Sequence, residues 1–187
     1  MPRKKSYNED EVIEKAMEVF WKNGFEMTSM QQLEKEMGIN KFSIYASFGS
    51  KEGLFLRSIQ CYKEKLQKVV EKLRRSTDGI EGIKAYFYDF ITFSKEHEMV
   101  KGCLVTNTAN ELRADANPEI LAALSDFTSE IRSVFLEKIQ QDSNLKIDDP
   151  EEKADYLLVA MFGLSSASRV FTQKQLHHYI ENIFNNL

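Results

Sequence analysis

Two short helical stretches joined by a turn with a single glycine follow a longer amphipathic stretch near the start of this sequence. The longer stretch covers residues 8–23, where apolar side chains recur at helical spacing, and Gly24 is a suitable C-terminal stop. The short stretches cover residues 28–37 and 40–48, with Gly38 between them. Because the connection is so short, these two helices must pack close together on the helix before them. This order matches a three-helix DNA reader, although a generic helical hairpin has a similar pattern.

Capping residues mark where helices begin. Thr28 and Gln31 have the spacing of a capping box, and Ser50 is suited to cap a long helix that joins the first part of the chain to the rest. Proline follows a capping residue at Asn117 and at Asp149, as in the first turn of many helices. Eight or nine helices are therefore expected. Beyond the first three, they cover residues 50–75, 79–97 and 101–112, followed by one that begins at 117, one that begins at 149 and a last one over residues 176–187.

The scarcity of helix-breaking residues supports this interpretation. Eight glycines and three prolines are few for 187 residues, which disfavours a loop-rich β architecture and favours long helices. With 42% hydrophobic residues, the chain can bury a sizeable core. We therefore expect an all-α fold, with an N-terminal three-helix helix-turn-helix domain in residues 1–50 and a C-terminal helical domain in residues 51–187.

The net charge of −4 argues at first against a nucleic-acid partner. The acidic excess lies in the second part of the chain, however, because residues 1–57 contain nine basic and nine acidic side chains. The basic arm Arg3-Lys4-Lys5 is either a solubilising tail or a contact to the minor groove and phosphates. It leads into an acidic helix rather than an apolar stretch, so we expect neither a secretory signal nor a membrane anchor, and a cytoplasmic protein.

Two segments of the first domain resemble a known family. Residues 16–33 read Ala-Met-Glu-Val-Phe-Trp-Lys-Asn-Gly-Phe-Glu-Met-Thr-Ser-Met-Gln-Gln-Leu, and residues 37–54 read Met-Gly-Ile-Asn-Lys-Phe-Ser-Ile-Tyr-Ala-Ser-Phe-Gly-Ser-Lys-Glu-Gly-Leu. They resemble the DNA-binding region of TetR/AcrR-family transcriptional regulators, most specifically in the ending Tyr-x-x-Phe-x-Ser-Lys-Glu. The rest of the chain matches only in the number and order of helices. The resemblance implies a dimeric, ligand-responsive repressor that binds double-stranded DNA and uses its second domain for sensing and dimerisation.

The third helix carries the expected contacts to DNA. The major groove admits one helix, and side chains near its N-terminus reach base edges. Lys41, Phe42 and Ser43 lie there and are the candidates for readout. Phe42 can touch a thymine methyl group, and Lys41 can donate to guanine or only to phosphate. A tyrosine and a phenylalanine three residues apart also occur in cores, and we assign Phe48 to the core. Three residues are expected to position the protein on phosphates, namely Tyr45, Lys51 and Thr28.

The last helix carries an apolar stripe that must be covered. If the stripe stayed exposed to water, the protein would lose on the order of 10 kcal/mol of hydrophobic stabilisation and would present an aggregation-prone patch. With the preceding helix, which is rich in small residues, it is expected to form a four-helix bundle with its symmetry mates; an intrachain core is the alternative. Such a dimer would place two recognition helices in successive major grooves of a palindromic operator. The expected dimerisation residues are Leu164, Leu176, Tyr179, Ile180, Ile183 and Phe184.

Aromatic residues are concentrated in the helix expected at residues 79–97, which has five of them between Tyr86 and Phe93. The apolar face of this helix is wider than one packing contact requires, as is typical of a central helix with several neighbours. The pattern is compatible with an aromatic-lined cavity for an apolar or aromatic small-molecule effector, and a solid core is the alternative. The expected ligand-binding residues are Tyr86, Phe90, Phe93, Cys103 and Asn107.

Cys103 lies in a Gly-Cys-x-x-x-Asn-x-Ala-x-Glu stretch, which resembles the corresponding helix of some family members. We expect this helix to open at Gly102, with Cys103 in its first turn. A helix N-terminus lowers the pKa of a thiol, so Cys103 is either a sensor of electrophiles or oxidants or a small buried hydrophobic residue. Asn107 and Glu111 follow on the same face and either line a pocket or form buried hydrogen bonds. Cys61 is too distant in sequence to suggest a metal or redox pair.

Other classes of function have weaker support. The sequence has no glycine-rich phosphate loop and no His-x-x-x-His pattern, and His97, His177 and His178 have no metal-ligand spacing. We therefore expect neither an enzyme nor a cofactor. A helical protein-interaction adaptor without specific DNA binding is the stronger rival, and it would show no salt-dependent DNA affinity. In the regulator, an effector in the second domain would shift the helix at residues 50–75 and so change the separation of the recognition helices.

Overall fold

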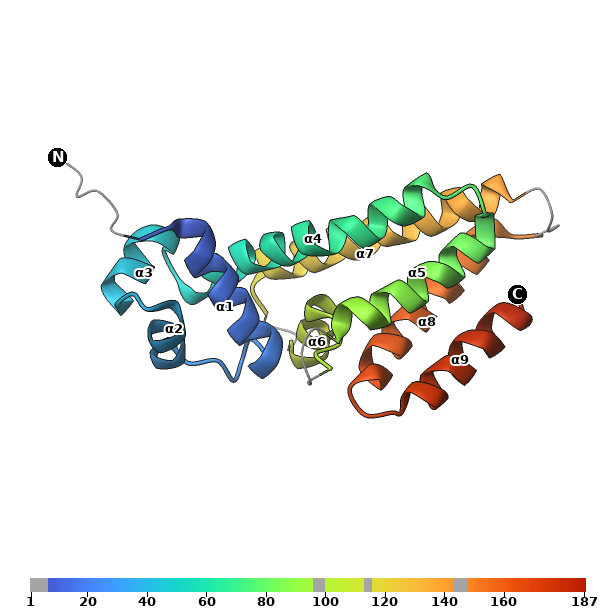
Figure 1. The fold of residues 1–187 in the computed structure, drawn as a ribbon. Coiled ribbons are helices and arrows are strands. Elements are labelled where there is room, and N and C mark those ends of the chain that lie inside the picture. Colours follow the sequence, from blue (N-terminus) through green and yellow to red (C-terminus); the bar gives the residue numbers. More distant parts are fainter. Residues whose placement is uncertain (1–6, 96–99, 113–115, 143–147) are drawn as a thin grey trace.

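The computed structural model describes residues 7–95, 100–112, 116–142 and 148–187, and within these ranges the regular structure is entirely α-helical (Figure 1). The all-α prediction and the expected number of helices are confirmed. The Arg3-Lys4-Lys5 arm and His97 lie outside the described residues. The nine helices found in these ranges are α1 (Glu9–Asn23), α2 (Met30–Met37), α3 (Lys41–Phe48), α4 (Lys51–Arg75), α5 (Gly79–Ser94), α6 (Leu104–Glu111), α7 (Pro118–Gln141), α8 (Pro150–Ser168) and α9 (Gln173–Asn185).

Most helices begin where a capping residue was predicted. The side chains of Asn40 and Ser50 accept hydrogen bonds from backbone N–H groups in the first turns of α3 and α4. At α2, however, the capping box lies one residue later than predicted. Ser29 accepts from the Gln32 N–H (3.2 Å), and the Gln32 side chain accepts from the Ser29 N–H (2.8 Å). Thr28 instead turns inward and donates to the Gly24 carbonyl oxygen, 2.6 Å away.

The segment before α6 also differs from the prediction. Gly102 has φ +69°, in the left-handed region, and Cys103 is extended, so the helix begins only at Leu104. Cys103 therefore precedes the first turn instead of lying within it. Its N–H donates to the Ser165 hydroxyl oxygen on α8 (2.9 Å), which ties this segment to the body of the molecule.

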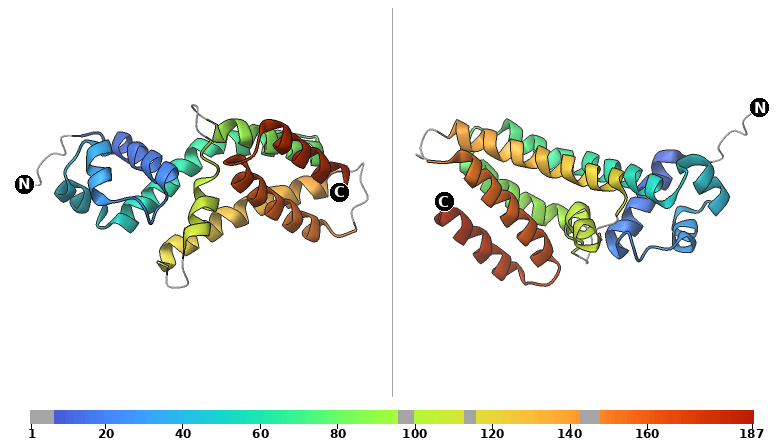
Figure 2. Two further views of the ribbon diagram at one scale, coloured as in Figure 1. Left: turned by 90° about the horizontal axis from the view of Figure 1, so that it is seen from below. Right: turned by 180° about the vertical axis from the view of Figure 1, so that it is seen from behind.

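The helices form an elongated molecule with α1, α2 and α3 at one end and the remaining helices extending away from them (Figures 1 and 2). α4 begins in the three-helix unit and runs into the body, where α7 lies beside it. Buried apolar residues form one continuous core through both parts, to which α4 contributes Phe55, Ile59 and Tyr62. None of the helices in the described ranges has both the length and the apolar character needed to span a bilayer.

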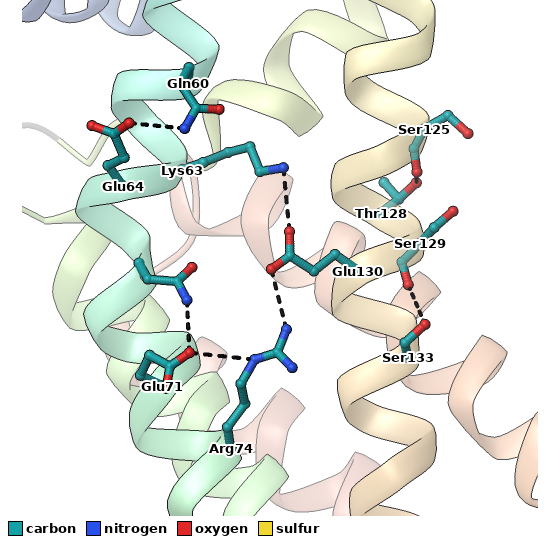
Figure 3. A network of polar contacts seen from close by, with 11 residues as sticks. Gln60, Lys63, Glu64, Glu71, Arg74, Ser125, Thr128, Ser129, Glu130 and Ser133 are labelled. Atoms are coloured by element: carbon teal, nitrogen blue, oxygen red, sulfur yellow. Dashed lines mark hydrogen bonds and ion pairs between the residues drawn. The ribbon is translucent and has the colours of Figure 1, made fainter.

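Polar side chains hold α4 against α7 along their length (Figure 3). Glu130 on α7 contacts Lys63 and Arg74 on α4, each with a 3.3 Å ion pair. Further along α7, the buried ammonium group of Lys138 donates to the carbonyl oxygens of Arg74 and Ser76, both 2.8 Å away, where α4 ends. A cation satisfies the free carbonyl groups at a helix C-terminus. These contacts make α4 and α7 a stable frame for the sites described below.

Candidate functional site

α3 presents a row of large side chains to solvent. Phe42 is 83% exposed and Tyr45 is 41% exposed, whereas Ile44 is completely buried and anchors the helix. Lys41 is also exposed, and its ammonium group lies 5.6 Å from the centroid of the Tyr45 ring. Ser43 is half-buried, and its N–H donates to the Asn40 side chain (2.8 Å). Four of the six residues predicted to contact DNA therefore lie on one short helix, three of them with exposed side chains.

The other two predicted DNA contacts lie elsewhere and are less accessible. Thr28 is 1% exposed and its hydroxyl group donates to the Gly24 carbonyl oxygen, so it stabilises the turn after α1. The ammonium group of Lys51 lies 4.5 Å from the centroid of the Phe25 ring and donates to the Glu26 carbonyl oxygen (3.4 Å). Partial burial lowers the pKa of Lys51, although nearby Glu26 opposes this effect. Both residues support the loop between α1 and α2.

Trp21, the single tryptophan, connects the three-helix unit to the body, a role that sequence analysis did not identify. Its indole N–H donates to the Gly102 carbonyl oxygen (3.1 Å), and its ring lies edge-on to Tyr62 and stacks on Phe93. The Lys101 ammonium group lies 4.7 Å from the centroid of the same ring and pairs with Glu18 on α1. The segment before α6 is thus bound directly to α1.

A second connection runs from the other end of α6. A carboxylate oxygen of Glu111 accepts a hydrogen bond from the Glu26 N–H, 3.1 Å away. The same carboxylate lies so close to Gly24 that a Cβ atom at that position would be 2.1 Å from it. α6 is therefore joined to the three-helix unit at both of its ends.

The body contains a small buried cavity, with a volume of about 20 Å³, between α4, α5, α6, α7 and α8. Of the predicted ligand-binding residues, Tyr86, Phe90 and Cys103 line it. Phe93 packs on Trp21 instead, and the Asn107 side chain donates to the Lys101 carbonyl oxygen (2.8 Å). A cavity of this size holds a single water molecule, so the conformation described here is close to the solid-core alternative.

The thiol of Cys103 is 5% exposed, and its burial raises its pKa. The hydroxyl group of Tyr62 lies beside this thiol and is completely buried. Burial likewise raises the pKa of Tyr62. The environment of Cys103 is thus opposite to the thiolate-stabilising one expected at a helix N-terminus.

The apolar stripe predicted to form a dimer lies largely inside the protomer. Leu164, Leu176, Ile180 and Ile183 are at most 5% exposed, because α9 turns its apolar face towards α5 and α8 of its own chain. The remaining two residues are Phe184, whose ring contacts Phe87, and Tyr179, which is 38% exposed and donates to the Ala160 carbonyl oxygen.

A different set of apolar side chains remains exposed. Nine large hydrophobic residues in the described ranges are exposed, and five of them lie on α8, α9 or the loop between these helices. Single exposed apolar residues are common on protein surfaces, whereas a group of them marks an interaction surface. The five residues, named here the α8–α9 patch, are Tyr156 (46%), Val159 (70%), Val170 (79%), Phe171 (52%) and Tyr179 (38%).

Residues 12–57 match the family model described as "Bacterial regulatory proteins, tetR family". This range begins in α1, ends in α4 and includes every residue of α2 and α3. Relatives extend the likeness to almost the whole chain: the "Uncharacterized HTH-type transcriptional regulator YezE" of Bacillus subtilis is 28% identical over 176 residues, which are 91% of this chain and 90% of YezE. The chain is a TetR-family transcriptional regulator.

Two further proteins similar to this TetR-family regulator are a repressor and a regulator solved in complex with DNA. The "HTH-type transcriptional repressor ComR" of Escherichia coli is 26% identical to it, with 89% of this chain and 82% of ComR covered. A solved structure of the TetR-family regulator CifR, a cysteine mutant complexed with 26-bp double-strand operator DNA, is 28% identical, covers 98% of both chains and has a TM-score of 0.85. The family consists of regulators, so the enzyme alternative is set aside.

Proposed function

We propose that this TetR-family regulator is a homodimeric repressor that binds a palindromic operator through α3 and is released by a small-molecule effector. The exposed face of α3 carries the proposal. A phenylalanine that is 83% exposed contributes little to the fold, but it is suited to contact a thymine methyl group in the major groove. The similar regulator CifR, solved in complex with operator DNA, supports the same nucleic-acid partner, and the similar repressor ComR supports the same sign of regulation.

The side chains on α3 divide into two roles. Lys41, Phe42 and Ser43 lie in its first turn, and we assign base readout to them. Tyr45 lies one turn later, where its exposed hydroxyl group can reach a phosphate. Lys51 adds positive charge at the N-terminus of α4, which also favours an anion. Thr28 acts only indirectly, through the turn that holds α2 in place.

The α8–α9 patch is the proposed dimer surface. It replaces the buried stripe of α9, which has no free side to offer to a partner. Gly163 on α8 is also exposed, and the Tyr179 hydroxyl group of the patch lies over it, where a Cβ atom would be 2.9 Å from the hydroxyl oxygen. Covering an exposed valine or aromatic side chain contributes roughly 1.5 to 3 kcal/mol, which gives five such residues enough free energy for a stable pair.

The proposed coupling between effector and operator runs through α6. Cys103, just before α6, lines the cavity, and the adjacent Lys101 and Gly102 contact α1. Expansion of the cavity would move this segment and with it the three-helix unit. The change in operator affinity must be matched by an equal change in effector affinity, typically 1 to 3 kcal/mol.

Selection of genomic DNA fragments by the purified protein at physiological salt tests the DNA-binding proposal. A Lys41→Ala/Tyr45→Ala variant removes two contacts on α3, and Lys174→Ala removes the same charge from an exposed site on α9 as a matched control. We expect the wild type and Lys174→Ala to enrich one palindromic sequence and the double variant to enrich none. Failure of all three proteins to enrich DNA would favour a protein-interaction adaptor instead.

Modification of Cys103 is a second possible route of release, and it is tested separately. We expect Cys103→Ser to bind the operator as the wild type does, because the thiol lies far inside the body. If oxidants or electrophiles release the wild type from the operator but not Cys103→Ser, the thiol is the sensor. If both proteins respond alike, or neither does, the effector acts without the thiol.

A further inference from the structure

An apolar groove opens on the surface of the body, close to the buried cavity. Its volume is about 400 Å³, which is within the range of small-molecule sites. Val105, Ala109 and Leu112 of the α6 segment form one wall, and Leu121 and Leu124 of α7 form another. The large apolar side chain of Leu121 is 44% exposed at this groove. None of the residues that line the groove carries a charge.

Phe162 of α8 belongs to both spaces. Its side chain lines the outer groove and also the inner cavity next to Cys103, and it is half-buried. It is the single residue common to the two linings. The ring therefore separates a space large enough for a ligand from one that holds only a water molecule. Two other residues that line the groove, Ala109 and Ser125, have small side chains, which leaves room for the ring to move.

We propose that Phe162 is a gate, and that an uncharged, mainly apolar molecule enters through the groove and occupies the enlarged cavity. This inference rests on the proposed ligand response, and it adds the entry route and the chemical class of the effector. The charge is excluded because neither lining offers a charged partner, and burial of an unpaired charge is costly.

Access to Cys103 measures the gate without any DNA. In a Cys61→Ser background, Cys103 is the single thiol, and its alkylation by N-ethylmaleimide is followed by mass spectrometry. We expect Phe162→Ala to accelerate the reaction about tenfold. Ser125→Trp, which fills the groove from its exposed rim, should slow it several-fold. Ser129→Trp, one turn away on α7 and outside the groove, is the matched control and should leave the rate unchanged.

Two results would overturn the gate. One is an equal alkylation rate in Ser125→Trp and Ser129→Trp. The other is a rate that follows the free energy of unfolding of each variant, measured in urea, because Cys103 is then reached by unfolding rather than through the groove. Phe162→Leu, which keeps an apolar side chain in the core, guards against a loss of stability in Phe162→Ala.

A pair of probes that differ mainly by one charge tests the ligand class. Phenylnaphthylamine is uncharged, and anilinonaphthalene sulfonate carries the same rings with a sulfonate. We expect the uncharged probe to bind about tenfold more tightly, to protect Cys103 from alkylation and to lose affinity in Ser125→Trp. Equal binding of both probes, or binding without protection, contradicts the proposal. Neither assay contains DNA, so a protein that passes them but binds no operator would refute only the proposed repressor.

Discussion

The indole N–H of Trp21 donates a hydrogen bond to the carbonyl oxygen of Gly102, 3.1 Å away, although 81 residues separate them in the chain. Trp21 lies on α1 of the DNA-binding unit, and Gly102 immediately precedes the cysteine that lines the cavity. Lys101 strengthens this junction through its contact with the indole ring and its ion pair with Glu18. A displacement of this segment can therefore reach α1 without first moving α4.

Replacement of Trp21 by phenylalanine tests this junction. The variant keeps a ring between Tyr62 and Phe93 but leaves the Gly102 carbonyl group without its donor. We expect the free energy of unfolding to fall by about 1 to 3 kcal/mol, whereas Trp21→Ala, which also opens a cavity, should cost about 3 to 5 kcal/mol. Urea denaturation followed by circular dichroism measures both, because the only tryptophan is removed. Equal stability of Trp21→Phe and wild type would show that the hydrogen bond contributes nothing.

The turn after α1 gives a second prediction. Gly24 has φ +87° and lies against the Glu111 carboxylate, whereas Gly38 has φ +70° with no neighbour within 4 Å. Gly38→Ala should therefore cost only the backbone strain, about 1 to 2 kcal/mol. Gly24→Ala should cost more, because it must also displace the carboxylate from the Glu26 N–H. Thermal and urea unfolding of the two variants give the comparison.

The double variant Gly24→Ala/Glu111→Ala separates strain from crowding. If the carboxylate is the obstacle, its removal should make Gly24→Ala less costly than it is in the presence of Glu111. A cost of Gly24→Ala that is the same with and without Glu111 would mean that backbone strain explains the whole effect.

The sequence was sufficient to predict what depends on local rules. Helix periodicity and caps such as Asn40 and Ser50 placed the boundaries of α3 and α4 within one residue. The cap of α2 is Ser29 instead of the predicted Thr28. The two residues are adjacent, and both have a hydroxyl side chain suited to cap a helix. Only the tertiary environment, in which Thr28 meets the buried Gly24 carbonyl group, distinguishes them.

Contacts between distant segments could not be predicted. The stripe on α9 had to be covered, but periodicity cannot say whether the cover is α8 of the same chain or a partner. In the structure, Leu176 and Ile180 are buried within the protomer, and five of the nine exposed large apolar residues in the described ranges lie on α8, on α9 or in the loop between them. The contact of Trp21 with Gly102 and the position of Phe162 between the groove and the cavity likewise arise from helices that meet only in the folded chain.

The ion pair between α5 and α9 predicts a dependence of stability on pH. The Lys84 ammonium group, followed by the Tyr88 hydroxyl group, lowers the pKa of the Glu181 carboxyl group. A lowered folded-state pKa stabilises the protein above the unfolded-state pKa of about 4.3, and this contribution is lost as the pH falls through the folded-state pKa. We therefore expect the stability difference between wild type and Glu181→Gln to be constant from about pH 7 to 5 and to shrink towards pH 3.

A Lys84→Met background provides the control for this titration. Without the ammonium group, the main cause of the lowered pKa is absent, so Glu181→Gln should have a smaller effect that varies less with pH. Unfolding free energies of the four proteins at pH 7, 5 and 3 complete the cycle. An undiminished difference in the Lys84→Met background would assign the effect to the Tyr88 hydrogen bond instead.

The α8–α9 patch makes the last prediction. Val159 is 70% exposed in the single chain, so Val159→Arg should leave the fold of the protomer intact but bury an unpaired charge in any interface formed there. We expect this variant to sediment as a monomer at micromolar concentration. Leu121→Arg, the same kind of change at an exposed site on α7, should stay dimeric. Because a dimer contacts both halves of a palindrome at once, the monomer should also lose about 10² to 10⁴ in operator affinity. A Val159→Arg protein that remains dimeric with full affinity would move the interface to another surface.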